Sequence, residues 1–317
     1  MRLTKKISLF AAAAAITAST AVLAAPTFIN VLTGGTSGVY YPIGVALSQL
    51  YSNGIEGSKT SVQATKASVE NLNLLQAGRG ELAFALGDSV SDAWNGVEDA
   101  GFKTPLKKIR AIAGTYPNYI QIVANAESGI KTLEDLKGKR ISVGAPKSGT
   151  ELNARAIFEA AGLSYQDMGK VEFLPYAESV ELIKNRQLDA TLQSSGLGMA
   201  AIRDLASTMK ISFVAIPAEV TAKIDNAAYE AATIPAGTYD GQDADVPTVA
   251  ITNILVTHEK VSDEVAYQMT KLMFDNLAAL GNAHSAAKDI KLENATKNLP
   301  IPLHPGAERF YKEAGVL

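Results

Sequence analysis

The chain has 317 residues, a formal net charge of −3 and no cysteine. Without cysteine it can form no disulfide, no thiolate metal site and no cysteine nucleophile. The slightly acidic balance argues against nucleic acid as a partner, because phosphate backbones are bound by clustered lysine and arginine.

The first 24 residues have the pattern of a secretory signal peptide. Arg2, Lys5 and Lys6 form a basic start, residues 7–23 are apolar, and small residues precede a predicted cleavage before Ala25. Removal of residues 1–24 moves the formal net charge from −3 to −6. No cysteine is available for a lipid anchor, so we expect a free periplasmic protein; an uncleaved anchor is the alternative. No later segment has 18 uncharged apolar residues in a row.

The segment TGGTSGVYYPIG, residues 33–44, follows an apolar strand pattern and precedes a helix pattern. We expect Pro42 at the first helical position, where its missing N–H costs nothing. The free N–H groups of a first helical turn form an anion site. Hydroxyls of four residues crowd the same turn, namely Thr36, Ser37, Tyr40 and Tyr41. The alternative is an ordinary glycine-rich loop.

The next segments continue a strand and helix alternation. Residues 60–64 alternate as a strand, Ser68 is placed to cap a helix that stops at Gly78, and residues 82–86 form a third strand. A loop of Gly87, Asp88 and Ser89 is expected to close that strand. This βαβαβ order favours a parallel sheet with helices on its faces.

The alternation then breaks and restarts. Residues 109–124 form a long strand-rich stretch, after which Thr132 and Asp135 give a capping-box pattern and residues 140–143 a strand. The segment GAPKSGTE, residues 144–151, leads into a helix. Strands are expected at 171–174, 190–192 and 211–216, a second long stretch at 247–257, and one helix at 262–280.

Two long extended segments that interrupt a βα series predict two crossings between lobes. We expect an α/β fold of the two-lobe periplasmic binding protein type, in which each lobe is a mixed, mostly parallel sheet flanked by helices. Residues 25–118 plus 251–317 would form lobe 1 and residues 119–250 lobe 2. The competing interpretation is a single sheet of nine or ten strands.

The candidate ligand site lies between the lobes. The second glycine segment offers Ser148, Gly149 and Thr150 at another helix start, opposite the first one. Ligands of open α/β sheets bind at the carboxyl ends of strands. This adds Gly87, Asp88, Gln193 and Ser194, with Tyr116 as an aromatic wall. Asp88 and Glu151 would bind an ammonium group or simply cap a helix.

The patterns for catalysis are weak. Ser128 and Lys131 match S-x-x-K, and residues 147–149 resemble K-T-G, but their order and separation differ from those of penicillin-recognising enzymes. The three histidines, His258, His284 and His304, have no partner at metal-ligand spacing. We therefore expect no catalytic residues, metal or cofactor. A periplasmic serine hydrolase that uses Ser128 or Ser37 is the alternative.

With these motifs in hand, the chain resembles the TAXI family of solute receptors of tripartite ATP-independent periplasmic (TRAP) transporters. The resemblance rests on residues 33–44, 132–144, 148–150 and 234–239, and on IPLHPGAERFYKEAGVL at 301–317. It implies a monomeric receptor that closes on a ligand and delivers it to a membrane permease. A sensor that is not coupled to transport is a second alternative.

The same resemblance implies a ligand such as glutamate, glutamine, 2-oxoglutarate or a related dicarboxylate. Carried onto this chain, Thr36, Ser37, Tyr40 and Tyr41 would contact the ligand from one lobe. Ser148, Gly149 and Thr150 would do so from the other, with Tyr116 at the crossing. This chain departs from its relatives at residues 196–198, where Gly-Leu-Gly replaces Gly-Tyr-Pro. No arginine occupies the candidate loops, so N–H groups and hydroxyls would bind the carboxylate.

Overall fold

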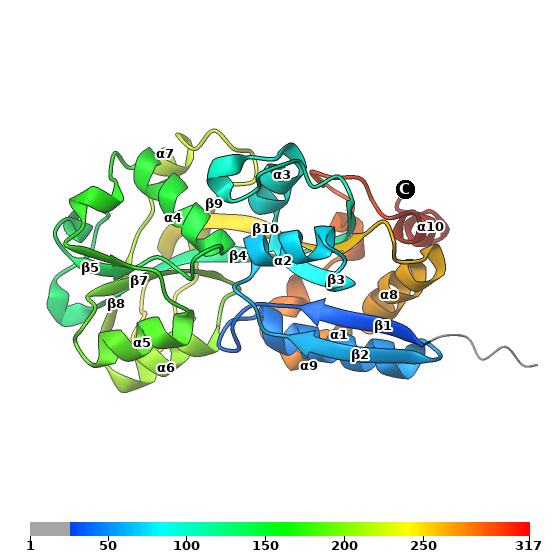
Figure 1. Ribbon diagram of the computed structural model, residues 1–317. Coiled ribbons are helices and arrows are strands. Elements are labelled where there is room, and N and C mark those ends of the chain that lie inside the picture. Colours follow the sequence, from blue (N-terminus) through cyan, green and yellow to red (C-terminus); the bar gives the residue numbers. More distant parts are fainter. Residues whose placement is uncertain (1–25) are drawn as a thin grey trace, which may run out of the picture.

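The computed structural model describes residues 26–317 (Figure 1). The predicted signal peptide and its cleavage site before Ala25 lie outside the described residues. Within residues 26–317, no helix is both long enough and apolar enough to span a membrane.

The strands are β1 (Thr27–Leu32), β2 (Ser58–Gln63), β3 (Leu82–Leu86), β4 (Ile109–Asn125), β5 (Arg140–Ser142), β6 (Lys170–Glu172), β7 (Ala190–Ser195), β8 (Ile211–Val214), β9 (Glu230–Ile234) and β10 (Val246–His258). The α-helices are α1 (Tyr40–Gly54), α2 (Ser68–Gln76), α3 (Gly87–Asn95), α4 (Gly149–Ala160), α5 (Tyr176–Lys184), α6 (Ala200–Thr208), α7 (Ala218–Thr221), α8 (Asp263–Asp275), α9 (Leu277–Ala283) and α10 (Pro305–Glu313). Short 3-10 turns lie at Glu98–Ala100, Ala126–Ser128, Glu134–Leu136, Tyr165–Asp167, Ser285–Asp289 and Leu292–Asn294.

The strands form a curled, mixed sheet in the order β2-β1-β3-β10-β4-β7-β5-β6, with β8 on β4 and β9 on β10. β1 pairs in parallel with β2 and β3, and β5 pairs in parallel with β6 and β7. The two long strands β4 and β10 are antiparallel to their neighbours. The predicted α/β class and the parallel βαβαβ start are confirmed.

The long strands β4 and β10 join two halves of the molecule. β4 pairs with β10 from Ile109 to Tyr119 and with β7 from Tyr119 onward. β10 pairs with β9 up to Ala250 and with β3 from Asn253. Hydrogen bonding is therefore continuous through ten strands, as the single-sheet interpretation held, but the helices gather in two groups along it (Figure 1).

We call the group with β1–β3, α1–α3 and α8–α10 the first half, and the group with β5–β9 and α4–α7 the second half. The exchange of strand partners at Tyr119 and Ala250 supports the lobe boundaries inferred from sequence, 118/119 and 250/251, which stay a proposal.

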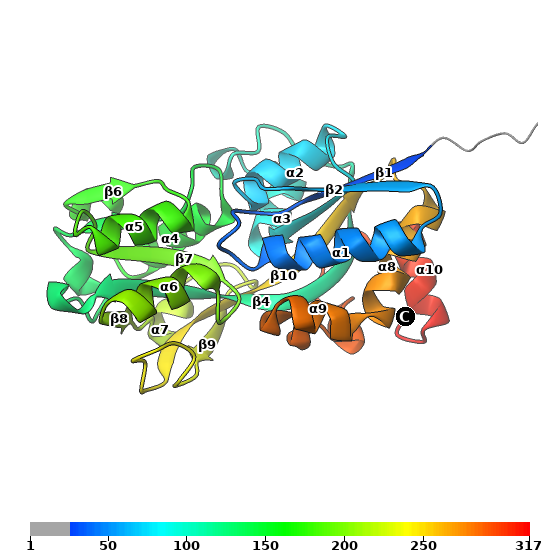
Figure 2. The same ribbon diagram turned by 90° about the horizontal axis from the view of Figure 1, so that it is seen from below.

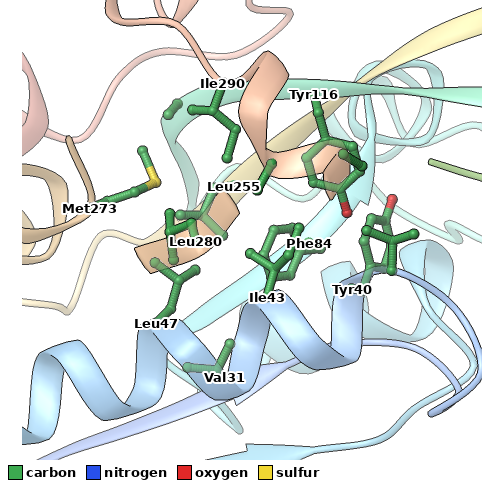
Figure 3. Packing of buried hydrophobic residues seen from close by; sticks show 14 of the residues in the cluster. Val31, Tyr40, Ile43, Leu47, Phe84, Tyr116, Leu255, Met273, Leu280 and Ile290 are labelled. Atoms are coloured by element: carbon green, nitrogen blue, oxygen red, sulfur yellow. The ribbon is translucent and has the colours of Figure 1, made fainter. Parts of the chain in front are cut away.

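Helices cover both faces of the first half (Figure 2). On one face, Ile43 and Leu47 of α1 pack into a cluster with Phe84 of β3 and Leu255 of β10 (Figure 3). All four are buried, and each stabilises the fold by about 1.5–3 kcal/mol relative to an exposed position. On the other face, α2 and α3 pack against alternate residues of the same strands. On the inward face of α1, Ile43 and Leu47 are buried, whereas Ala46 and Leu50 are half-buried.

Several predicted boundaries are wrong for identifiable reasons. α1 begins at Tyr40, so Pro42 is its third residue, a position where an N–H would have no helical partner and proline's lack of one costs nothing. Residues 87–89 form no loop, because α3 begins directly at Gly87 after β3. The helix predicted over 262–280 is two helices, since Asn276 departs from helical geometry with φ −127° and ψ 30°.

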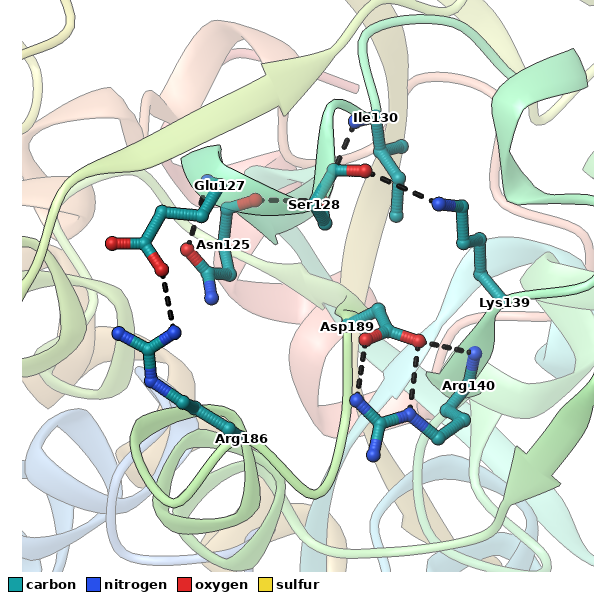
Figure 4. A network of polar contacts seen from close by, with 8 residues as sticks. All are labelled: Asn125, Glu127, Ser128, Ile130, Lys139, Arg140, Arg186 and Asp189. Atoms are coloured by element: carbon teal, nitrogen blue, oxygen red, sulfur yellow. Dashed lines mark hydrogen bonds and ion pairs between the residues drawn. The ribbon is translucent and has the colours of Figure 1, made fainter.

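Two sets of polar contacts stabilise the second half. The predicted capping box is present, since the Asp135 carboxylate accepts from Thr132 N at 2.9 Å. The helix at this point is a short 3-10 turn and not an α-helix. Asp189, which precedes β7, accepts from the Arg140 Nε at 3.0 Å and from its Nη2 at 2.6 Å (Figure 4). This paired contact ties β5 to β7 and lowers the pKa of Asp189.

Candidate functional site

A pocket of about 120 Å³ lies between the two halves. A single water needs about 10–15 Å³, so the pocket has room for a small organic molecule. The residues that line it are Gly34, Gly35, Gly38, Val39, Tyr40, Thr65, Lys66, Ala67, Ser68, Leu86, Asn118, Ala145, Ser148, Gly149, Thr150, Pro175, Tyr176, Ser194 and Ser195.

Four helices begin at this pocket, α1 and α2 in the first half and α4 and α5 in the second. The residues at these helix starts that line the pocket are Val39 and Tyr40, Ala67 and Ser68, Ser148 to Thr150, and Pro175 and Tyr176. First-turn N–H groups have no partner within their own helix, and the helix dipole adds positive potential there. The convergence of four helix starts therefore makes the pocket favourable for an anion.

Local sequence explains where two of these helices start. The Ser148 hydroxyl oxygen accepts from the backbone N–H of Glu151 at 3.2 Å, which caps α4. Ahead of α2, Ala67 adopts φ 69°, a left-handed conformation that turns the chain abruptly. The prediction that Ser68 caps α2 is wrong, because Ser68 is the first residue of the helix and Ala67 is at the cap position. The Ser68 hydroxyl accepts from Leu86 N at 3.1 Å and thereby links α2 to the end of β3.

Two tyrosine hydroxyls at the pocket stay neutral. Burial raises the pKa of Tyr40 well above its ordinary value of 10, and burial raises the pKa of Tyr176 as well. The Tyr40 ring stacks on Phe84 with centroids 5.0 Å apart, so its orientation is fixed by the core (Figure 3). Both phenols therefore remain protonated at neutral pH.

A chain of hydrogen bonds connects the pocket walls of the two halves. The Tyr40 hydroxyl donates to Asn253 Oδ1 at 2.5 Å, and the Asn253 amide donates to Asn118 Oδ1 at 2.8 Å. The Asn118 amide donates to the Ser194 carbonyl at 3.0 Å. The Tyr176 hydroxyl donates to the same carbonyl at 2.8 Å. These bonds hold the pocket wall in place before any ligand arrives. They use the single O–H hydrogens of Tyr40 and Tyr176, so the donors left for a ligand are Lys66, the Ser194 hydroxyl and first-turn N–H groups.

Within residues 26–317, some buried polar atoms near the crossing strands have no hydrogen-bond partner. The hydroxyl of Ser194 is one, in a residue that is 4% exposed and lines the pocket. The Tyr116 hydroxyl and the Gln193 side-chain amide are others. A buried hydroxyl without a partner costs about 1–3 kcal/mol, which a ligand in the pocket would recover at Ser194.

Five of the twelve residues predicted from sequence line this pocket: Tyr40, Ser148, Gly149, Thr150 and Ser194. The other seven, Thr36, Ser37, Tyr41, Gly87, Asp88, Tyr116 and Gln193, do not. Thr36 is exposed at the loop tip, and the Ser37 carbonyl accepts from Ala201 N at 3.3 Å. Gln193 is not in a loop, because β7 continues to Ser195.

Asp88 lies instead in a second cavity, between α3, α4 and the segment before β9. Its carboxylate accepts from Asn153 Nδ2 at 2.6 Å and from the Tyr229 hydroxyl at 2.7 Å. Burial outweighs these hydrogen bonds and raises the pKa of Asp88 to about 6. Glu151 is likewise engaged, since both of its carboxylate oxygens accept from the Arg155 guanidinium at 2.7 Å.

Sequence reasoning missed several lining residues, above all Lys66, Ser68, Asn118 and Tyr176. Lys66 and Ser68 follow the carboxyl end of β2, where the rule on strand ends applies as it does to the chosen loops. Lys66 is the only side chain in the lining that carries a charge at neutral pH. Within the described part of the chain it forms no ion pair.

The hydroxyl of Ser128, the candidate nucleophile, is used structurally (Figure 4). It donates to the Asn125 carbonyl at 2.6 Å, and the Ser128 carbonyl accepts from Lys139 Nζ at 3.2 Å. Lys131, the partner that S-x-x-K would require, is exposed, and its backbone N–H donates to Asp135. Among residues 26–317, no three or more histidine, aspartate or glutamate side chains are grouped to hold a metal ion.

Comparison with solved structures shows the same fold in binding proteins. PhnD1 from Prochlorococcus marinus, solved with methylphosphonate, has a TM-score of 0.56 at 12% identity and covers 92% of this chain and 100% of its own. A binding protein component of an ABC phosphonate transporter from Pseudomonas aeruginosa has a TM-score of 0.53 at 11% identity, with 87% and 83% covered. The alkanesulfonate-binding protein SsuA from Xanthomonas axonopodis pv. citri, bound to MOPS, has a TM-score of 0.51 at 15% identity, with 91% and 84% covered.

The likeness to these structures concerns the fold, which is that of periplasmic binding proteins. At the level of sequence, the pattern of the NMT1-like family matches residues 31–315, nearly the whole chain. The protein belongs to the NMT1-like family.

Proposed function

We propose that this protein is a periplasmic solute receptor that encloses a small carboxylate between its two halves and delivers it to a membrane permease. The observation that carries the proposal is the convergence of four helix starts on one pocket whose lining contains a lysine and no carboxylate. Helix N-termini bind anions through N–H groups and the dipole, without a paired cation.

Binding needs no chemical step here. Hydrogen bonds within the protein hold the polar groups of the wall in place, and the hydroxyl of Ser194 is free to gain a partner when a ligand arrives. Since α1 and α2 belong to the first half and α4 and α5 to the second, a ligand would be gripped from both sides. Hinge closure around such a ligand is a common conformational change in two-part binding proteins.

The head group of the ligand has two candidates. A planar carboxylate is favoured by the resemblance of residues 33–44 and 301–317 to the TAXI receptors. A tetrahedral phosphonate or sulfonate is what the structural neighbours named above bind. Both head groups are anions that accept several hydrogen bonds, so the helix starts suit either one.

A ligand panel tests the proposal. We expect the unfolding temperature of the purified protein to rise with at least one acid among 2-oxoglutarate, succinate, glutamate, methylphosphonate and ethanesulfonate, because a ligand that binds only the folded state stabilises it. Stabilisation by a carboxylate alone supports the head group proposed here, whereas stabilisation by methylphosphonate alone would replace it. Stabilisation by a neutral sugar and by no acid would contradict the anion receptor.

We propose further that the permease is of the TRAP type and is driven by an ion gradient. Uptake of the labelled acid by intact cells should then stop when an ionophore removes the gradient while ATP is maintained. Uptake that survives the ionophore but stops on ATP depletion would indicate an ABC transporter instead. A strain that lacks this gene is the matched control in both arms.

A further inference from the structure

We infer that the solute is an organic anion without an ammonium group, so that the receptor discriminates against amino acids and in favour of acids of the same size. The inference rests on the proposed function and narrows its substrate class. It follows from the charges and the hydrogen-bond acceptors that surround the pocket.

No carboxylate lines the pocket. Among its 19 lining residues, Lys66 is the only one with a charged side chain, and its charge is positive. The four helix starts add positive potential at the same place. An ammonium group would thus enter a site of like charge and lose its hydration without an ionic partner, which is costly in a low-dielectric site.

Four acidic residues lie within two positions of lining residues, and none of them lines the pocket: Glu70, Asp88, Glu151 and Glu178. The Glu70 carboxylate accepts from the Lys66 backbone N–H at 2.6 Å, and Glu178 is exposed. The two buried ones, Glu151 and Asp88, are paired elsewhere. Glu151 is 3% exposed, and its carboxylate accepts from Nε and Nη2 of Arg155. It also accepts from the Tyr165 hydroxyl at 2.9 Å. Asp88 accepts hydrogen bonds from Asn153 and Tyr229 in the second cavity. Neither carboxylate is available to an ammonium group in the pocket.

Backbone carbonyls at the wall are occupied as well. The Ser194 carbonyl already accepts from Asn118 and Tyr176, and the Ala145 carbonyl accepts from Ser148 N at 3.2 Å. The Gly35 carbonyl accepts from Gly38 N at 3.2 Å. Each of these carbonyls thus has a protein donor already, whereas the Ser194 hydroxyl, Lys66 and the first-turn N–H groups are donors without an acceptor among the described residues. A ligand whose polar atoms are all acceptors fits this pattern, and a ligand with an NH₃⁺ group does not.

The experiment compares matched pairs that differ only by the amine. Calorimetric titration is carried out with 2-oxoglutarate against L-glutamate, succinate against L-aspartate, ethanesulfonate against taurine, and ethylphosphonate against 2-aminoethylphosphonate. In whichever pair binds, we expect the member without nitrogen to bind at least tenfold more tightly. Equal or tighter binding of the amine-bearing member overturns the inference and leaves the anion receptor intact.

Failure of the proposed function gives a different result. If no member of any pair binds, the proposal of an anion receptor is wrong and the inference fails with it.

A variant provides an independent test. Lys66→Gln should weaken binding of the preferred acid by about tenfold and reduce the difference in affinity between the two members of its pair. Lys59→Gln, an exposed lysine on β2 outside the pocket lining, should leave both affinities unchanged. If Lys66→Gln changed neither the affinity for the preferred acid nor the difference in affinity within its pair, the proposed role of charge at the site would be contradicted.

Discussion

Gly149 of α4 lies so close to Ser68 of α2 that a Cβ atom at position 149 would stand 2.7 Å from the Ser68 hydroxyl oxygen and 3.0 Å from its Cβ. It would also meet the Leu86 side chain at 2.7 Å. Ser68 cannot easily give way, because its hydroxyl accepts from Leu86 N. Since Gly149 belongs to the second half and Ser68 to the first, this contact sets how closely the halves approach around the pocket.

Gly149→Ala should therefore weaken solute binding while the protein stays folded. Overpacking costs about 1–3 kcal/mol, which is a loss of roughly tenfold or more in affinity, and an open arrangement of the halves relieves it. Calorimetry with the best solute from the panel measures the loss. Gly281→Ala in α9 is the control, since its Cβ would meet only the flexible Lys288 side chain. Equal affinities for wild type and Gly149→Ala would show that the contact does not limit closure.

Removal of Asn253 should destabilise the protein and also weaken binding. This residue is fully buried; it accepts from the Tyr40 hydroxyl and donates to the Tyr116 carbonyl at 2.7 Å. Asn253→Ala leaves at least two buried polar groups without partners, at about 1–3 kcal/mol each. Urea denaturation should show the loss of stability. Ser61→Ala, which removes an exposed hydrogen bond to Asn30, should change stability by less than about 0.5 kcal/mol. A similarly small change in Asn253→Ala would contradict the network.

Asp88 should make the protein more stable in mildly acidic solution. Burial raises its pKa from 3.8 to about 6, so the folded state carries a penalty for the charged carboxylate that is full above about pH 7. The penalty shrinks as pH falls through 6 and is gone below about 4, where both states are protonated. We expect the free energy of unfolding to rise by about 1 kcal/mol between pH 7 and pH 5.

The matched variant for this pH dependence is Asp88→Asn. It removes the buried charge, and the Asn153 amide can turn over to meet the new side chain. The variant should be more stable than wild type at pH 7 and should lack the rise toward pH 5, both read from urea unfolding at each pH. A variant that is less stable at pH 7 with an unchanged slope would show that the charged carboxylate is a net stabilising group.

Asp189 should make the protein less stable in acidic solution, the opposite of the effect of Asp88. The hydrogen bonds and charge of Arg140 hold the pKa of this carboxyl below its usual value, so its contribution is present at neutral pH and is lost as pH falls below about 4. Asp189→Asn should cost about 1–2 kcal/mol at pH 7. Arg186→Gln, which breaks an exposed ion pair with Glu127, should cost less than about 1 kcal/mol. If Arg186→Gln lowered the free energy of unfolding more than Asp189→Asn does, the more buried ion pair would not be the more stabilising one, which would contradict this prediction.

The sequence predicted the fold well because its signals are local and repeated. The alternation of strand and helix patterns identified the parallel start β1 to β3, and the two long stretches identified β4 and β10. Boundaries were less accurate where tertiary contacts decide. Asn276 interrupts α8 and α9 within an otherwise continuous apolar pattern, and nothing in that pattern marks the break.

The candidate site was predicted in part. Tyr40 and residues 148–150, chosen from the glycine segments, line the pocket, because helix starts after strands have a recognisable pattern; their contact with a ligand stays a prediction. Asp88 was misplaced since the end of β3 passes directly into α3, which carries the carboxylate into another cavity. Tyr176 and Asn118 reach the pocket through the crossing of the two halves, a long-range relationship that no local pattern contains.

The most direct test of the central claim is a structure of the protein with its preferred acid bound. We expect the acid oxygens in the pocket between α2 and α4, about 2.7–3.2 Å from first-turn N–H groups such as those of Gly149 and Thr150, with the Ser194 hydroxyl as a further donor. An acid bound in the cavity beside Asp88, or one in the pocket with its acid group turned away from the helix starts, would contradict it.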